Sequence, residues 1–400
     1  MKISDIIYGN QAIKPYHSRR VRRVRYIVRF MNKGVFNGGF NMGNISNHPE
    51  RKTYHQQKYI DNTLRLRAVL KTLPPFARDY FRAVEPTTSA RTRISYAYDI
   101  RVFFHFLLES NPLYRDYTMD QFTLSDLEKL EPVDIEEYQE YLKVYENEEN
   151  KQITNTEKGL ARKMSALRSF YGYFYKRQAI AKNPTLLVDM PKLHEKAIIR
   201  LDADEVASLL EYVDHGGDNL TGQRKAYFEK TKNRDLAILT LLLGTGIRVS
   251  ECVGLDIQDI DFKNNGIKVT RKGGNEMVVY FGKEVENALK SYLYTTRKST
   301  LPLPGHENAL FLSTRRRRMG VQAVENMVRK YAREVTPDKK ITPHKLRSTY
   351  GTALYKETGD IYLVADVLGH KDVNTTKKHY AAIDENRRRQ AAGAVKLREL

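Results

Sequence analysis

Apolar residues recur every three or four positions between residues 54 and 185, and this spacing predicts amphipathic α-helices. One helix is expected after Pro74, a second from Thr87 to Leu108, a third after Pro132 and a fourth from Thr156. The core-facing positions are Ile94, Tyr98, Val102 and Phe106 in the second helix, Ile135, Tyr138 and Leu142 in the third, and Leu160, Met164, Leu167, Phe170 or Tyr171, and Phe174 in the fourth.

The polar face of the fourth predicted helix is basic. It carries Arg162, Lys163 and Arg168, and no acidic residue lies between Gly159 and Ala181. A charged helix face is usually only solvated, but one without counter-charges can also lie against a phosphate backbone. Periodicity and charge alone leave both interpretations open.

The helical periodicity lapses over residues 186–201, which predicts an extended basic linker and a domain boundary near residue 200. Beyond the linker, a buried helix is expected to follow Asn233. It is broken at Gly244 and Gly246 and resumes through Arg248.

Three short runs rich in β-forming residues predict a small sheet, at residues 259–262, 266–271 and 277–281. Asn-Asn-Gly and Lys-Gly-Gly-Asn separate the runs, and both are tight-turn signals. Lys272 is therefore expected at the edge of a hairpin turn. A helix is expected again over residues 284–296.

Residues 341–380 place chemically active side chains at helix ends. Thr342 followed by Pro343 is a helix start signal, so His344 and Arg347 share a face of the first turn. Two potential cations at a helix N-terminus oppose the macrodipole unless an anion lies in front of them. A phosphate would fit there.

Gly359 is expected to end that helix and Asp360 to cap the next one. Gly369 then occupies a C-cap position, which leaves His370 just beyond a helix end. A last short helix is expected to carry Tyr380. Each residue alone is ordinary, but their combination points to a functional site.

A length of 400 residues indicates two or three domains. The net charge of +20 indicates that the protein meets a polyanion. The basic residues are spread over many segments, which favours nucleic acid over a membrane surface as the partner. Residues 1–53, rich in Arg, Gly and Asn, predict a disordered basic arm that either lies on DNA or is only solvated. The run Arg315–Arg318 is interpreted as a phosphate contact in preference to a solvated loop.

The remaining totals exclude several classes of protein. The sequence has no apolar run of about 18 residues and no secretory signal pattern. Its one cysteine, Cys252, fits a reducing compartment and rules out Cys-based zinc sites, so a cytoplasmic location is expected. It also lacks Mg²⁺-type carboxylate clusters and a GxxxxGKS/T loop, so no metal or other cofactor is predicted.

Cleavage of a phosphodiester needs charge neutralisation, a nucleophile and a proton for the leaving oxygen. The residues that could surround one phosphate are Arg248, Lys272, His344, Arg347 and His370, with Tyr380 as the nucleophile. Arginine binds phosphate oxygens bidentately, and a phenol with a pKa of about 10 ionises far more easily than an alcohol. Lys272 or a histidine could protonate the leaving oxygen.

Five motifs in the second half carry a family resemblance. GTGIRVSE, TRKGG, TPHKLR, LGH and the Tyr380 segment occur in this order, and together they resemble the tyrosine recombinase family of phage integrases and Xer proteins. The segment ending ARKMSALRSFYGYFYKR is similar to the family's N-terminal core-binding domain. The resemblance covers roughly residues 73–395.

The resemblance implies a mostly α-helical protein with a small antiparallel β-sheet, in which two domains clamp duplex DNA. The expected organisation is an arm over residues 1–53, a core-binding (SAM-like) domain over 54–185, a linker over 186–201 and a catalytic domain over 202–400. The implied protein is a site-specific DNA recombinase that acts as a homotetramer on its recombination site and is a monomer or dimer off DNA.

The resemblance also implies a role for each residue of the site, through a 3′-phosphotyrosyl intermediate formed without metal or ATP. Arg248 and Arg347 would hold the scissile phosphate, His344 and His370 would assist, Lys272 would be the general acid and Tyr380 the nucleophile. Glu251 would orient the active-site groups. The core-binding resemblance favours DNA contacts by Arg162, Lys163 and Arg168.

Two alternatives share these residues. A type IB topoisomerase would use the same chemistry as a monomer without site preference, and a catalytically idle DNA-binding protein would keep only the clamp. Within the recombinases, the sequence does not decide between a mobile-element integrase and a chromosome-dimer resolvase. Two positions depart from the family pattern, because Tyr380 follows His370 by ten residues and Ser348 stands where a histidine often follows the second arginine.

Overall fold

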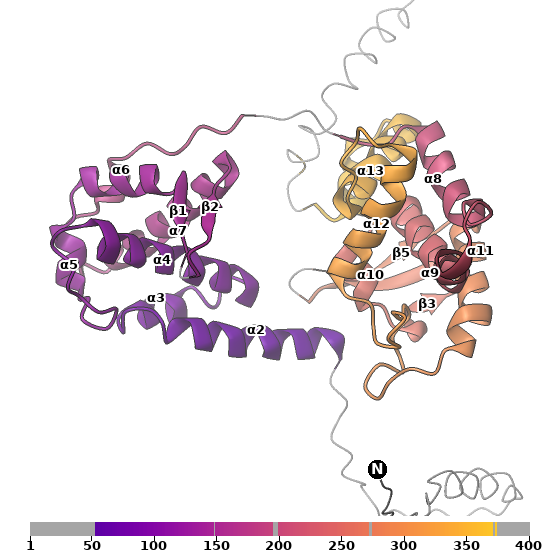
Figure 1. Ribbon diagram of the computed structural model, residues 1–400, viewed down its shortest axis with the longest axis horizontal. Helices are drawn as coiled ribbons and strands as arrows, with labels where there is room; N and C mark the ends of the chain where they lie inside the picture. The colour runs from indigo at the N-terminus through magenta and orange to yellow at the C-terminus, as the bar shows by residue number, and fades with distance from the viewer. Residues whose placement is uncertain (1–52, 148, 195–198, 272–273, 371–372, 374–400) are drawn as a thin grey trace, which may run out of the picture. The chain divides into compact units, whose positions relative to one another are not determined.

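Two large hydrophobic cores organise the described part of the chain. The computed structural model describes residues 53–147, 149–194, 199–271, 274–370 and 373 (Figure 1). One core gathers buried side chains between Leu66 and Val188, and the other gathers those between Leu201 and Leu346. The division falls within the predicted linker. The described chain is mostly α-helical with short antiparallel strands, which confirms the predicted fold class.

The part of the chain around the first core is a set of helices and one hairpin. Its elements are α2 (Tyr54–Leu70), α3 (Ala77–Ala83), α4 (Ala90–Ser110), α5 (Leu124–Lys129), α6 (Pro132–Tyr141), β1 (Val144–Glu146), β2 (Gln152–Thr154), α7 (Glu157–Lys176) and the 3-10 turn η1 (Pro184–Leu186). Aromatic rings fill the space between α4 and α7. Phe104 and Phe170 are fully buried and meet edge to face, with their ring centroids 6.2 Å apart.

The predicted apolar stripes are confirmed in α6, in α7 except for half-buried Leu160, and only in part in α4. Met164 and Phe170 of α7 are fully buried. In α4, Tyr98 and Val102 are only half-buried, whereas Phe103 and Phe104 are fully buried. The reason is that α4 packs against both α2 and α7, so its buried surface is wider than one stripe.

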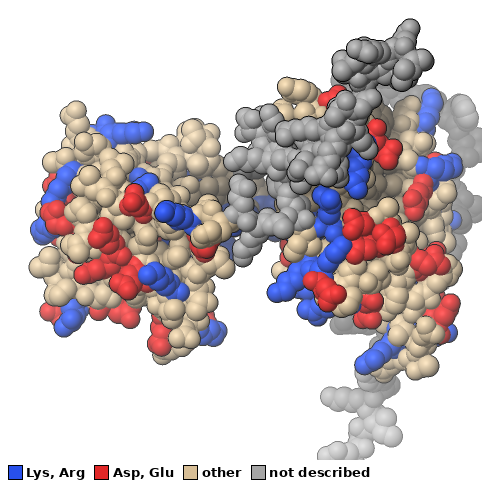
Figure 2. All heavy atoms as spheres, turned by 90° about the horizontal axis from the view of Figure 1, so that it is seen from above, with Lys and Arg blue, Asp and Glu red and all other residues tan. Residues whose placement is uncertain are grey.

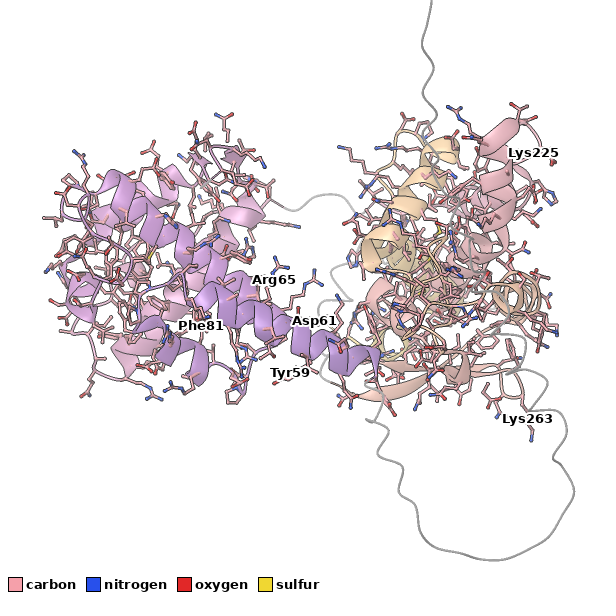
Figure 3. All side chains as sticks on the ribbon, turned by 60° about the horizontal axis from the view of Figure 1, so that its bottom comes forward. Tyr59, Asp61, Arg65, Phe81, Lys225 and Lys263 are labelled. Carbon is pink, nitrogen blue, oxygen red and sulfur yellow. The ribbon has the colours of Figure 1, made fainter. Side chains whose placement is uncertain are left out.

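Three local features differ from the sequence expectation or add to it. The helix expected after Pro74 begins at Ala77, because a turn occupies the residues before it. The β1–β2 hairpin is not indicated by the sequence, since three-residue strands are too short to show an alternating pattern. Helix α2 exposes Tyr59, Asp61 and Arg65 (Figure 3).

The part of the chain around the second core combines helices with a three-stranded sheet. Its elements are α8 (Ala203–His215), α9 (Gly222–Thr245), α10 (Val249–Gly254), the 3-10 turn η2 (Ile257–Asp259), β3 (Ile260–Asp261), β4 (Gly266–Thr270), β5 (Glu276–Tyr280), α11 (Lys283–Tyr292), the π-turn η3 (Leu293–Arg297), α12 (Val321–Val335), α13 (Pro343–Thr358) and α14 (Ile361–Leu368).

The central helix of this part is α9, which is longer than predicted. It begins at Gly222, well before Asn233, and runs through Gly244 to Thr245. Gly244 does not break the helix; a Cβ there would lie 2.5 Å from Val285 of α11, so the glycine lets the two helices approach closely. Gly246, at φ +64°, is the residue that ends α9.

The predicted sheet is confirmed, with strand order β3-β4-β5 and antiparallel pairing throughout. The turn after β4 is closed by two backbone hydrogen bonds. The amide of Arg271 donates to the carbonyl of Asn275 at 2.7 Å, and the amide of Gly274 donates to the carbonyl of Arg271 at 3.0 Å. Lys272 falls between them in sequence and lies outside the described residues.

The run of four arginines divides into two roles. Arg315, Arg316 and Arg317 are exposed. Arg318 instead makes contacts within the protein. Its guanidinium donates to the carbonyls of Val253 and Leu255 and forms an ion pair with Asp256. The phosphate contact stays a prediction for the three exposed residues, whereas Arg318 is occupied within the protein. In the described part of the chain, no helix is long and apolar enough to cross a bilayer.

Candidate active site

Arg248 is held where α9 ends and α10 begins. It is the N-cap residue of α10, and its backbone amide donates to Glu251 Oε2 at 2.8 Å. Its Nη1 donates to Glu251 Oε1, also at 2.8 Å. The Glu251 side chain is 4% exposed and that of Arg248 is 36% exposed. A buried carboxylate thus orients a guanidinium that still reaches the surface.

Arg347 and His344 lie on the first two turns of α13, which begins at Pro343 as predicted. Thr342 precedes the helix, but its side chain makes no capping hydrogen bond. His344 is exposed, whereas Arg347 is 5% exposed. The guanidinium of Arg347 donates to the carbonyls of Gly246 and Leu368, and so joins the end of α9 to the end of α14.

His370 follows the C-cap of α14, as the sequence predicts. Asp360 caps the start of this helix, with its carboxylate accepting from the amides of Tyr362 and Leu363. Gly369 ends the helix at φ +61°, and the amide of His370 donates back to the carbonyl of Ala365 at 2.9 Å. Half-buried His370 is therefore placed by the helix end.

Three guanidinium groups converge on this end of α14. Arg271 donates to the carbonyl of Val367, Arg347 to that of Leu368, and Arg248 to that of Gly369. The last carbonyls of a helix lack intrahelical partners and carry partial negative charge, which cations stabilise. The described residues thus assemble a positively charged cluster from α10, the β4–β5 turn and α13, with His370 beside it.

Of the predicted catalytic residues, four are described. Arg248, Arg347 and the His370 segment are brought together, and His344 lies one turn before Arg347. Lys272 and Tyr380 lie outside the described residues, as do the last predicted helix, the tail and the basic arm. Arg271 was not among the predicted residues. Its only sequence signal is its position directly before Lys272, which does not show where its side chain goes.

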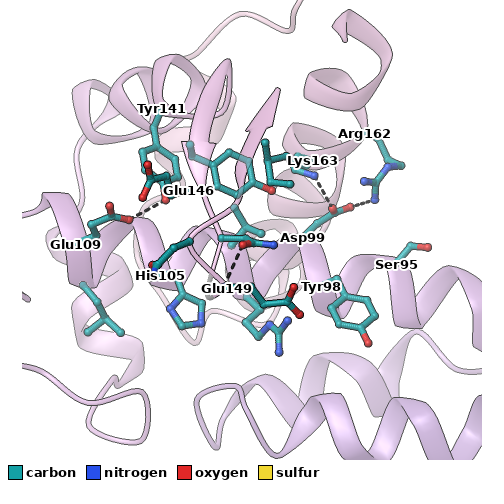
Figure 4. A pocket seen from close by; sticks show the side chains of 17 residues that line it. Ser95, Tyr98, Asp99, His105, Glu109, Tyr141, Glu146, Glu149, Arg162 and Lys163 are labelled. Atoms are coloured by element: carbon teal, nitrogen blue, oxygen red, sulfur yellow. Dashed lines mark hydrogen bonds and ion pairs between the residues drawn. The ribbon is translucent and has the colours of Figure 1, made fainter. Parts of the chain in front are cut away.

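The three predicted DNA-binding residues of α7 have different environments. Arg162 and Lys163 both form ion pairs with Asp99 of α4, which is 3% exposed (Figure 4). Lys163 is itself 7% exposed, whereas the Arg162 side chain is 47% exposed. Burial raises the pKa of the Asp99 carboxyl and lowers that of the Lys163 ammonium, although each charge favours the other.

Arg168 is also occupied within the protein, because its guanidinium donates to the carbonyls of Thr185 and Val188 after α7. Lys163 and Arg168 therefore have structural contacts within the protein, and their predicted DNA contacts stay a prediction. Only Arg162 of the three has an exposed side chain. On the visible face of the part of the chain around the first core, acidic and basic side chains are interspersed (Figure 2).

A cavity of about 700 Å³ opens beside the Asp99 ion pairs. Its lining includes Tyr98, His105, Glu109 and Tyr141, and the hydroxyl of Tyr141 donates to Glu109 at 2.8 Å (Figure 4). Among the described residues, no group of three or more His, Cys, Asp or Glu side chains is arranged to hold a metal ion.

Comparison with known proteins places this arrangement in a family. The model of the phage integrase family matches residues 199–387. The tyrosine recombinase XerC of Caldanaerobacter subterraneus subsp. tengcongensis is 33% identical over 327 residues, which cover 80% of this chain and 86% of the relative. The tyrosine recombinase XerS of Streptococcus equi subsp. equi is 30% identical over 344 residues, which cover 79% of this chain and 94% of the relative.

Solved structures show the same fold. The XerH recombinase in a post-cleavage complex with a palindromic difH substrate has a TM-score of 0.57 at 18% identity, covering 76% of this chain and 80% of that one. The Tn1549 transposon integrase in complex with circular intermediate DNA has a TM-score of 0.53 at 19% identity. The match covers 76% of this chain and 94% of that one.

The chain therefore belongs to the phage integrase family, the tyrosine recombinases. Within that class it is a tyrosine-type site-specific DNA recombinase. The family and the function implied by the five sequence motifs are confirmed.

Proposed function

We propose that this recombinase cuts duplex DNA at a specific site by attack of Tyr380 on the scissile phosphate. The observation that carries the proposal is the convergence of Arg248 and Arg347 on adjacent carbonyls at the end of α14, next to His370. In the DNA-bound enzyme, the non-bridging phosphate oxygens would take the place of these carbonyls as acceptors for the two guanidinium groups.

The proposed reaction balances without an added cofactor. The Tyr380 hydroxyl gives its proton to solvent, its oxygen bonds to phosphorus, and the bond from phosphorus to the 5′ oxygen breaks. Lys272 gives a proton to that oxygen, which yields a 3′-phosphotyrosyl link and a free 5′-hydroxyl. Because the phosphoester energy is kept in the link, a 5′-hydroxyl from another strand can reverse the step without ATP.

Arginine charge performs the neutralisation in this scheme, and the histidines assist it. Arg248 is held in place by Glu251, while His344 and His370 lie on either side of Arg347 in the chain. The guanidinium fork matches the geometry of two phosphate oxygens and keeps its charge at any physiological pH.

The partners in the proposal are a double-stranded recombination site and further copies of the chain. Residues 54–185 would be the core-binding domain, 186–201 the linker and 202–400 the catalytic domain. Of the three predicted α7 residues, Arg162 has the exposed side chain that a phosphate contact requires. Exchange between two sites requires four protomers, and the C-terminal tail is proposed to tether neighbouring copies.

Covalent capture tests the proposal. The full-length protein is incubated with a library of short duplexes that carry a randomised segment and a nick within it, so that the cut end diffuses away. Wild type should form a denaturation-resistant protein–DNA adduct, and sequencing the trapped DNA identifies the site. Tyr380→Phe should form none, because phenylalanine has no nucleophilic oxygen.

Tyr362→Phe is the matched control, since Tyr362 is an exposed tyrosine of α14. It should form the adduct as wild type does. An undiminished adduct with Tyr380→Phe would contradict the proposal. Strand exchange between two captured sites, scored against relaxation of a supercoiled plasmid without the site, separates a recombinase from a topoisomerase.

A further inference from the structure

Arg271 is fixed by its backbone at the start of the β4–β5 turn. Its amide donates to the carbonyl of Asn275 at 2.7 Å, and its carbonyl accepts from the amide of Gly274 at 3.0 Å. These two bonds define where the turn leaves and re-enters the sheet. Arg271 is therefore the last residue before the turn whose backbone the sheet constrains.

The side chain of Arg271 crosses to α14. Its Nη2 donates to the carbonyl of Val367 at 2.7 Å, and its Nη1 lies 3.5 Å from the carbonyl oxygen of Asp366. The guanidinium lies directly over Gly369, because a Cβ at that position would be 1.2 Å from Nη1. Only a residue without a side chain leaves room for this contact.

The surroundings of Arg271 do not favour a guanidinium for stability alone. Burial lowers the pKa of Arg271, the Glu251 carboxylate raises it and the Arg248 charge lowers it again, which places Arg271 within electrostatic reach of the Arg248–Glu251 pair. Its Nε is buried and has no acceptor among the described residues. Such an unsatisfied donor costs about 1–3 kcal/mol.

We propose that Arg271 is a positioning residue for strand cleavage, which clamps the start of the β4–β5 turn onto the end of α14. The residues next to the two clamped positions in the chain are Lys272 and His370. Because consecutive Cα atoms lie about 3.8 Å apart, a clamp at Arg271 limits how far from the end of α14 the next residue of the chain can be. This inference rests on the proposed function, in which Lys272 is the general acid.

The clamp matters because proton transfer requires hydrogen-bond reach. A general acid must come within about 2.6–3.2 Å of the oxygen that it protonates. Without Arg271, the turn would be held to the sheet by its own backbone bonds but not to α14. Arg271→Ala should therefore slow adduct formation by about 10²-fold, the lower end of what general acid catalysis contributes.

DNA with sulfur in place of the bridging 5′ oxygen separates positioning of the acid from other roles. The bond that breaks is then from phosphorus to sulfur, and the leaving group departs as a thiolate. Because a thiol has a pKa of about 8.5, this leaving group needs no proton. A defect in protonating the leaving group should disappear on this DNA, whereas a defect in holding the phosphate should remain.

The experiment measures adduct formation by full-length variants on oxygen and sulfur versions of the captured site. Lys272→Ala and Arg271→Ala should both be slow on the oxygen DNA and return to within about tenfold of wild type on the sulfur DNA. Arg248→Ala should be slow on both. Arg271→Gln keeps a long polar side chain if the alanine variant folds poorly, and it should behave as Arg271→Ala does.

Lys268→Ala is the matched control on β4, because Lys268 is exposed and pairs only at the surface with Glu276. It should match wild type on both DNAs. If Lys272→Ala recovers on sulfur DNA and the Arg271 variants do not, the clamp is not how Arg271 acts. If Lys272→Ala itself fails to recover, the general-acid assignment in the proposed function is wrong, and the route proposed for Arg271 falls with it.

Discussion

Glu251 is the residue on which the presentation of Arg248 depends. Its two carboxylate oxygens accept from the backbone amide and from the guanidinium of Arg248, both at 2.8 Å. One buried side chain therefore fixes the start of α10 and the direction of a proposed phosphate ligand. Charge-assisted hydrogen bonds of this kind are roughly twice as strong as neutral ones.

Glu251→Gln should weaken both stability and cleavage. A glutamine can still accept one hydrogen bond, but its amide nitrogen faces a guanidinium that also only donates. We expect the free energy of unfolding to fall by about 1–3 kcal/mol and adduct formation to fall more than tenfold, about the scale of one lost charged hydrogen bond.

Cys252 provides the measurement of stability. It is the only cysteine and is fully buried, and burial raises the pKa of its thiol to about 12. A thiol reagent at neutral pH should therefore react only when this part of the chain unfolds, so its reaction in rising urea reports stability. Glu276→Gln, at an exposed pair, is the control and should change stability by less than about 1 kcal/mol. Equal losses in both variants would contradict the role given to Glu251.

The residue types of the site could be predicted from the sequence, but their neighbours could not. Arg248, Arg347 and His370 were expected around one phosphate because each follows a recognisable helix signal. The contact of Arg271 with Gly369 joins a strand end to a helix end. Local residue spacing cannot predict a contact between positions so far apart in the sequence. Lys163 was assigned to a DNA surface because charge indicates solvent exposure, whereas a buried Asp99 holds it inside.

At the scale of elements, the joint between α4 and α7 contains a buried charge. Asp99 of α4 and Lys163 of α7 are both nearly inaccessible to solvent. The pKa of each group is shifted by burial toward its neutral form, so burial opposes the ion pair that the two charges favour. We therefore expect the pair to fix the register of α7 on α4 more than it adds stability.

Removing one partner of this pair should be costly, and removing both should not. Asp99→Asn leaves the Lys163 charge buried with weaker compensation and should reduce the free energy of unfolding by about 3–5 kcal/mol. The double variant Asp99→Leu, Lys163→Met should recover to within about 2 kcal/mol of wild type. Urea unfolding followed by circular dichroism measures both.

Asp79→Asn serves as the control for this experiment, because its pair with Arg82 is exposed on α3 and should contribute less than about 1 kcal/mol. If the double variant is no more stable than Asp99→Asn, the pair contributes to stability directly and the register argument is wrong. The DNA affinity of the double variant also bears on Lys163, since a surface contact by this residue would lower it.

Elements were predicted most accurately where one face alone is buried. Helices α6 and α7 match their apolar stripes, and α13 and α14 begin and end at the expected capping residues. The start of α9 was missed because residues 222–227 are all exposed, and Phe228 is the first buried residue of the helix. The predicted break at Gly244 was also wrong, because Gly244 allows close packing against α11 and only Gly246 ends the helix.

At the scale of the whole molecule, charge is unevenly distributed along the chain. Residues 1–50 contain nine Lys and Arg against two Asp and Glu, and so carry +7 of the total of +20. Phosphate contacts release counterions, so the logarithm of DNA affinity falls with the logarithm of salt concentration by about 0.9 for each contact. A basic segment that lies on DNA therefore has a measurable signature that does not depend on sequence recognition.

Deleting residues 1–50 should lower DNA affinity uniformly and leave site preference intact. We expect the salt slope to decrease in magnitude by about 2 or more, the equivalent of at least two phosphate contacts, equally for the captured site and for unrelated DNA. Binding titrations at several salt concentrations measure the slope, and strand exchange at the captured site should persist. A matched full-length variant with the six arginines of residues 18–30 replaced by Gln separates charge from length. An unchanged slope in both variants would show that this segment stays off DNA, and a loss of exchange restricted to the deletion would show that it does more than supply charge.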